Sequence, residues 1–130
     1  MTGYLINFSG HPLSARAEEL LKESFEKIVE AHWPEFDFDE PLDQQMQAVF
    51  KKLDVTLDGR TPITIIPPGQ STLAILLVSF VHGMIGHFPR LCYLGLSDNG
   101  VYLPKFQSGI NIQNMRTAGR RLRTKLVSGA

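Results

Sequence analysis

Short apolar runs alternate with longer amphipathic segments along most of the chain. The apolar runs at residues 4–8 and 61–66 each end in a small polar loop, at residues 9–14 and 67–72, and a helical pattern follows each loop. Continuous apolar runs of this length are typical of strands buried on both faces, whereas apolar positions three and four apart are typical of helices. The sequence therefore predicts two strand-loop-helix units.

The first two helical patterns lie in the N-terminal half. Ser14 is a candidate N-cap for a helix whose apolar positions recur at helical spacing up to about Ala31. A second amphipathic helix is predicted over about residues 42–53. Between them, Phe36 and Phe38 alternate with acidic residues, which predicts a short edge strand.

Two more helices are predicted in the C-terminal half. One is capped by Ser71 or Thr72 and ends near Gly86; because it is apolar almost all round, we expect it at the centre of the fold or at a subunit interface. The other begins near Asn111, with apolar residues on one stripe and arginines on another face.

The remaining apolar runs predict two strands. Residues 91–96 have the character of a buried strand, and the turn sequence at 97–100 leads into an antiparallel strand at 101–103, closed by Pro104. Alternation of strands and helices implies right-handed crossovers and a mainly parallel sheet with helices on both faces. We therefore expect a single Rossmann-like α/β domain over residues 1–130, with an antiparallel edge hairpin.

Length and composition narrow the class of protein. A chain of 130 residues is long enough to bury one core, and its only cysteine, Cys92, excludes an internal disulfide and fits a reducing compartment as a small buried apolar residue. The longest apolar segment, residues 73–85, is shorter than the roughly 20 residues that span a bilayer. We therefore expect a cytoplasmic protein with no membrane segment.

The net charge of zero hides a strong asymmetry along the chain. Of 13 acidic residues, 12 lie at or before Asp58, whereas eight of the 13 basic residues follow it. A basic second half attracts nucleotide phosphates without making the protein a binder of double-stranded DNA. The alternative is that these charges form solvated helix faces of opposite sign that favour self-association.

Several common chemistries lack their sequence signatures. The glycine-rich dinucleotide motif, the P-loop and the Gly-x-Ser-x-Gly elbow are missing, so we expect neither NAD nor ATP chemistry nor a serine hydrolase. The four histidines have no metal-ligand spacing with Cys92 or with carboxylates, so no metal or other cofactor is expected. For His82 and His87, which lie away from the predicted loops, a structural role is favoured over catalysis.

The two polar loops are the candidate binding site. Parallel strands deliver both loops, and the helix N-termini that follow them, to one edge of the sheet, where unpaired N–H groups and the helix dipole attract anions. His11 is placed either to hydrogen-bond a phosphate or ribose hydroxyl or to stabilise its loop. The candidate ligand-binding residues are Asn7, Ser9, Gly10, His11, Pro68, Gly69, Gln70, Ser71 and Thr72.

Three segments carry a resemblance to a known family. Residues 5–14 (LINFSGHPLS), 66–71 (IPPGQS) and 81–90 (VHGMIGHFPR) resemble small ancillary proteins of type III CRISPR systems, which have a CRISPR-associated Rossmann-like (CARF-like) fold. The resemblance implies a homodimer that recognises the messenger cyclic tetra-adenylate across paired loops, with further association through the ligand left open. Asn7, Gln70 and Thr72 then either contact adenine edges and ribose hydroxyls or only cap backbone groups, and Gly10 and Gly69 either admit the ligand or only permit a turn.

Three functions of different class remain open. The favoured one is a binding module that captures the messenger and damps antiviral signalling, because neither loop carries a lysine or arginine to stabilise a cleavage transition state. The second is a metal-independent ring nuclease, a phosphodiesterase that uses His11 as its acid or base. The third is an interaction protein that docks its basic C-terminal helix on an acidic partner.

Overall fold

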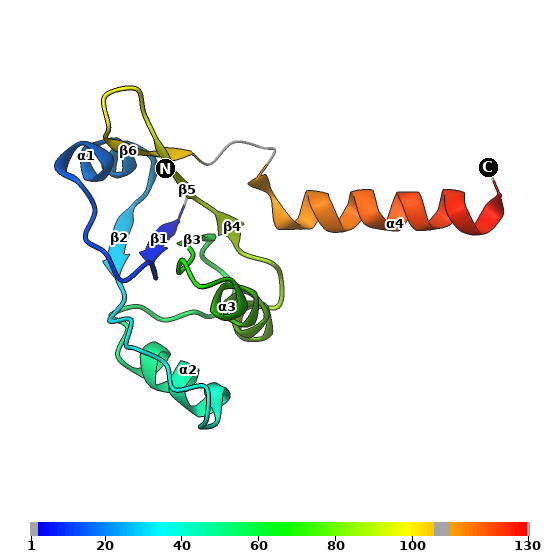
Figure 1. The fold of residues 1–130 in the computed structure, drawn as a ribbon, viewed down its shortest axis with the longest axis horizontal. Helices are drawn as coiled ribbons and strands as arrows, with labels where there is room; N and C mark the ends of the chain where they lie inside the picture. Colours follow the sequence, from blue (N-terminus) through cyan, green and yellow to red (C-terminus); the bar gives the residue numbers. More distant parts are fainter. Residues whose placement is uncertain (1–2, 106–109, 130) are drawn as a thin grey trace.

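A parallel sheet of four strands organises the chain, in the order β2-β1-β3-β4 (Figure 1). The computed structural model describes residues 3–105 and 110–129. The strands are β1 (Tyr4–Asn7), β2 (Lys27–Glu30), β3 (Ile63–Ile66) and β4 (Arg90–Leu91). All four residues of β3 are buried, as their continuous apolar character requires at the centre of a covered sheet. The predicted α/β class is confirmed, and the fold is Rossmann-like in character.

Helices cover both faces of this sheet, as predicted. The described residues form α1 (Ala15–Ser24), α2 (Leu42–Lys51), α3 (Ser71–Ile85) and α4 (Ile112–Ser128). Leu21 of α1 packs with Leu5 and Ile66 in one apolar cluster. The buried residues of α2 and α3 pack in a second cluster with Ile6 and Ile65, whose side chains leave the strands on the opposite face.

An antiparallel hairpin stands apart from the main sheet. It is formed by β5 (Tyr93–Leu96) and β6 (Tyr102–Lys105), so the run predicted as one strand over residues 91–96 is divided between two sheets. The division falls at Cys92, whose N–H still donates to the carbonyl of Ile65 over 2.8 Å before the chain leaves the sheet. The hairpin is thus antiparallel as expected, but it does not extend the edge of the sheet, and Pro104 lies within β6 instead of closing it.

The prediction that the first helix continues to about Ala31 is wrong. Helix α1 ends at Ser24 because Phe25 adopts an extended backbone (φ −125°, ψ 145°), and β2 then pairs in parallel with β1, Asn7 opposite Glu30. Apolar positions three apart occur at Phe25 and Ile28, so the segment shows a helical spacing although it is a strand. Hydrogen bonding along β1 outweighs that local pattern.

The predicted edge strand at Phe36 and Phe38 is also wrong, since this segment is a loop. Phe36 is buried against Trp33, with ring centroids 4.7 Å apart, whereas Phe38 is 51% exposed. The Asp37 N–H donates to Oε1 of Gln45 over 2.8 Å instead of to a neighbouring strand. A side chain on α2 therefore replaces the strand partner that the alternation suggested.

The last two helices follow the sequence closely. Helix α3 ends at Gly86 in the left-handed conformation (φ 81°), but its N-cap is Gln70, not Ser71 or Thr72. Helix α4 begins close to Asn111, as predicted; Asn111 is its N-cap, and the helix extends away from the sheet (Figure 1). Within the described residues, no helix has the length and apolarity needed to cross a bilayer.

Candidate functional site

The two predicted loops meet at a single cleft beyond the carboxyl ends of β1 and β3. The cleft has a volume of about 1090 Å³. Four of the candidate residues line it, Ser9 and His11 from the β1–α1 loop and Pro68 and Gly69 from the β3–α3 loop. Adjacent parallel strands place both loops at one sheet edge, which is where open α/β folds bind ligands.

The β5–β6 hairpin contributes a wall of this cleft that sequence analysis did not identify. Tyr93 and Tyr102, 58% and 55% exposed, are the aromatic residues of this wall. The turn at residues 97–100 predicted the hairpin but carried no information on where it lies relative to the loops. The further lining residues are Pro12, Leu13, Ser14, Ala17, Ile66, Pro67, Leu91, Cys92, Leu94, Gly100, Val101 and Ile110.

The side chain of Asn7 lies beneath the first loop and makes three hydrogen bonds there. Its side chain is 1% exposed; Nδ2 donates to the His11 carbonyl (2.9 Å) and to Oε2 of Glu30 (2.8 Å), and Oδ1 accepts from the Ser9 N–H (3.0 Å). The structure thus places Asn7 below the cleft, where it shapes the loop from the end of β1. This arrangement favours the backbone-capping role over contact with a base.

A tight turn brings His11 into the cleft. Ser9 Oγ accepts from the His11 N–H and donates to the His11 carbonyl, each over 3.2 Å, and Gly10 between them has φ of +79°. Because L-residues rarely adopt this conformation, the turn requires a glycine at position 10. Gly10 itself lies outside the main cleft.

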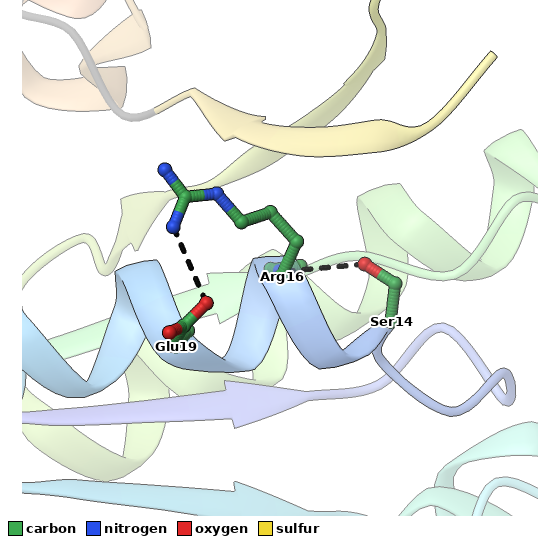
Figure 2. Close-up of polar contacts among 4 residues, drawn as sticks. Ser14, Arg16 and Glu19 are labelled. Carbon is green, nitrogen blue, oxygen red and sulfur yellow. Dashed lines mark hydrogen bonds and ion pairs between the residues drawn. The ribbon is translucent and has the colours of Figure 1, made fainter. Parts of the chain in front are cut away.

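The start of α1 provides backbone donors beside the first loop. Ser14 Oγ caps the helix by accepting from the Ala17 N–H over 3.1 Å, which leaves the N–H groups of Ala15 and Arg16 without intrahelical acceptors. Figure 2 shows this cap together with the ion pair between Arg16 and Glu19, 3.2 Å apart and exposed on both sides. The Arg16 side chain rises from α1 toward β6 (Figure 2).

The second loop is built differently. Gln70 is the N-cap of α3, and its Oε1 accepts from the Leu73 N–H over 2.7 Å. Ser71 and Thr72 are exposed in the first turn of the helix, outside the residues that line the cleft. Gly69 does line it, has no positive φ, and a Cβ built on it meets nothing within 4 Å. No turn therefore demands glycine at position 69, in contrast to Gly10.

Cys92 lies at the base of the cleft and is fully buried. Burial raises the pKa of its thiol to about 11, although a backbone hydrogen bond from Lys105 acts in the opposite direction. The thiolate that nucleophilic chemistry needs is therefore disfavoured at neutral pH. This matches the prediction of a small buried apolar residue.

A second, smaller cleft lies behind the first loop. It has a volume of about 480 Å³, and Gly10, Glu18, Glu30 and His32 are among its lining residues. Burial raises the pKa of the Glu30 carboxyl; the hydrogen bond from Asn7 lowers it, and the nearby Glu18 charge raises it further. This acidic wall repels anions, so the main cleft is the better place for a phosphate ligand.

Away from both clefts, His82 packs on Phe88, with ring centroids 4.4 Å apart. Among the residues that the structure describes, no three of the potential metal-ligating side chains are gathered in a metal-binding group.

Comparison with models of protein families, with curated proteins and with solved structures gives no match for this chain.

Proposed function

We propose that this protein is a CARF-like binding module that captures cyclic tetra-adenylate, the messenger of type III CRISPR signalling, and damps the signal by sequestering it. The observation that carries the proposal is the meeting of the β1–α1 and β3–α3 loops at one cleft, beside the N-termini of two helices. Helix N-termini bind phosphate through free N–H groups and the positive end of the dipole.

The size and lining of the cleft support a ligand larger than a single nucleotide. Its volume of about 1090 Å³ lies just above the range of about 300 to 1,000 Å³ found for pockets that hold small ligands. The lining is mainly apolar, with Tyr93 and Tyr102 available for stacking. Aromatic side chains bind bases by stacking, and backbone amides then take the phosphates.

A two-fold homodimer is part of this proposal. A ring of four phosphates has internal symmetry, and a two-fold axis duplicates both loops around one ligand. Each copy then supplies the loop around Ser9 and His11 and the loop around Gly69.

Capture is favoured over cleavage by the side chains around the cleft. Its described lining residues include no lysine, arginine, aspartate or glutamate. Cleavage of a phosphodiester gains from charges that stabilise the transition state and from an acid and a base near the scissile bond. Only the His11 imidazole meets that need here, whereas binding requires neither group.

The proposal is tested by incubating the full chain with labelled cyclic tetra-adenylate in the presence of a chelator. We expect the ring to migrate with the protein and to be recovered intact, at an amount set by the protein concentration. Conversion to linear fragments over many turnovers would instead establish a ring nuclease. Failure to bind cyclic tetra-adenylate, with the protein folded by circular dichroism, would refute the proposed function altogether.

A further inference from the structure

Helix α4 has an apolar stripe that nothing in the described chain covers. It is 17 residues long and has no buried residue. Met115, Leu122 and Leu126 are 68%, 56% and 72% exposed, and with Ile112 and Gly119 they recur at alternating spacings of three and four. That spacing forms one seam along a helix, as in helices that pack against a partner.

A helix of this length and composition gains little stability from its own backbone. The 17 residues of α4 only just exceed the length of about 12 to 15 below which even alanine-rich helices are marginal, and its sequence is not alanine-rich, while helical stability in proteins comes mainly from packing of an apolar face. Gly119 lowers the intrinsic stability of α4 further. The helix therefore needs a surface on which its seam is buried.

The charge of α4 indicates which kind of surface its seam packs against. It has five basic residues and no acidic one, so pairing of α4 with α4 of a second copy sets like charges against each other. The residues up to Asp58 carry an excess of acid that matches the excess of base in the rest of the chain, and the whole chain is neutral. The complementary surface is therefore present on the chain itself. The basic residues of α4 are Arg116, Arg120, Arg121, Arg123 and Lys125.

The face of the sheet covered by α2 and α3 combines the two required properties. On α3, Leu76 and Met84 are 39% and 41% exposed and lie on one side of the helix, with the half-buried Phe80 between them four residues from each, which forms an apolar strip; Ile75, 71% exposed, lies beside it. Asp58 lies near the end of that helix, since a Cβ on the adjoining Gly59 would lie 2.8 Å from the carbonyl oxygen of Ile85. Other exposed acidic residues on or before α2 are Glu35, Asp37, Asp39, Glu40 and Asp43.

We propose that α4 is an exchanged arm that docks on the α2–α3 face of a second copy of this chain, with its Leu122 and Leu126 seam on the apolar strip of α3 and its arginines toward the acidic residues. Two-fold symmetry lets each copy receive the arm of the other. This interaction surface goes beyond the binding of cyclic tetra-adenylate and does not rest on it.

The first test measures mass in solution without ligand. We expect the full chain to be a dimer by light scattering at micromolar concentration. Leu122→Glu with Leu126→Glu should be monomeric and still unfold in one cooperative thermal transition, with a loss of helical circular dichroism no greater than the 17 residues of α4. Gln113→Glu with Thr124→Glu makes the same charge change on the opposite side of α4, and this control should stay dimeric. A monomeric parent chain, or a dimeric seam variant, overturns the proposal.

The second test identifies the docking face. Leu122→Cys protein is mixed with Leu76→Cys protein and treated with a short bis-maleimide; the buried Cys92 is expected not to react. We expect a covalent heterodimer, and at least tenfold less of it when Thr124→Cys replaces Leu122→Cys. Cross-linking that is equal in both mixtures contradicts docking through the seam, and no cross-linking contradicts exchange between copies. Neither measurement uses the nucleotide. A dimeric seam variant, or an absence of cross-linking, contradicts the docking of α4 and leaves the capture of cyclic tetra-adenylate by a homodimer to its own binding assay.

Discussion

The side-chain amide of Asn7 donates to Oε2 of Glu30 over 2.8 Å, joining the carboxyl ends of two adjacent parallel strands. The same Nδ2 also donates to the carbonyl of His11. One buried residue thereby connects β2, β1 and the loop that lines the cleft. The geometry of the candidate site depends on this contact, although Asn7 lies below the cleft.

Replacing Asn7 with alanine should destabilise the fold more than any loop substitution. The change removes three hydrogen bonds and leaves the Ser9 N–H without its acceptor, for an expected loss of about 2 to 4 kcal/mol in the free energy of unfolding. Urea titration measures it. Glu30→Gln, which retains an oxygen that accepts from Asn7, is the control and should cost much less.

Stability should fall as the pH rises through the titration of Glu30. Its pKa is raised in the folded state from the ordinary value of 4.5, so the folded protein holds this proton at pH values where the unfolded chain has lost it. The contribution of Glu30 to the free energy of unfolding is therefore fully present below about pH 4.5. It is lost as the pH rises through the raised pKa that Glu30 has in the folded protein. The free energy of unfolding of the parent chain and of Glu30→Gln is measured by urea titration between pH 4 and 7, and the difference between them isolates the contribution of Glu30. Two free energies that change in parallel with pH would contradict the prediction.

Gly69→Leu should block the cleft without harming the fold. Its backbone has no positive φ and its Cβ position is open, so a side chain is accommodated there but occupies space needed by the ligand. We expect affinity for cyclic tetra-adenylate to fall at least tenfold, with an unchanged midpoint of thermal unfolding. Gly10→Ala is the contrasting variant, because its φ of +79° makes any side chain strained and should cost about 1 kcal/mol of stability.

His11→Ala separates capture from cleavage. If the protein only binds the messenger, loss of one hydrogen bond should weaken binding by about 1 to 3 kcal/mol, and neither protein should release linear product. Binding is measured by calorimetry and product by chromatography. A variant that binds normally, while a nuclease activity of the parent falls by about 100-fold, would reverse the assignment in favour of catalysis.

Tyr102 tests whether the hairpin wall holds a base. Tyr102→Ala should weaken binding of cyclic tetra-adenylate by about 1 to 3 kcal/mol through lost stacking, whereas Tyr102→Phe keeps the ring and should bind nearly as the parent does. Titration calorimetry on both variants provides the comparison. Equal affinity of the alanine variant and the parent would show that the ligand does not contact this part of the hairpin.

Much of the fold was predictable from local pattern. The buried apolar runs at β1 and β3, the Ser14 cap of α1 and the start of α4 near Asn111 each depend on a few neighbouring residues, so these features were located correctly. The cap of α3 was expected at Ser71 or Thr72 and lies at Gln70. From two strands followed by loops and helices, parallel pairing places both loops at one edge. The convergence of Ser9 and Gly69 on one cleft was foreseeable for that reason.

Tertiary contacts decided the rest. Whether residues 27–30 form a strand depends on the edge that β1 offers. Whether the segment around Phe36 is a strand depends on Gln45 of α2, which takes the Asp37 N–H and lies eight residues further along the chain, beyond the reach of the local alternation. The hairpin wall with Tyr93 and Tyr102 exists because the chain leaves the sheet at Cys92. Short patterns specify which surfaces of an element are apolar, whereas pairing and packing across the fold choose what covers them.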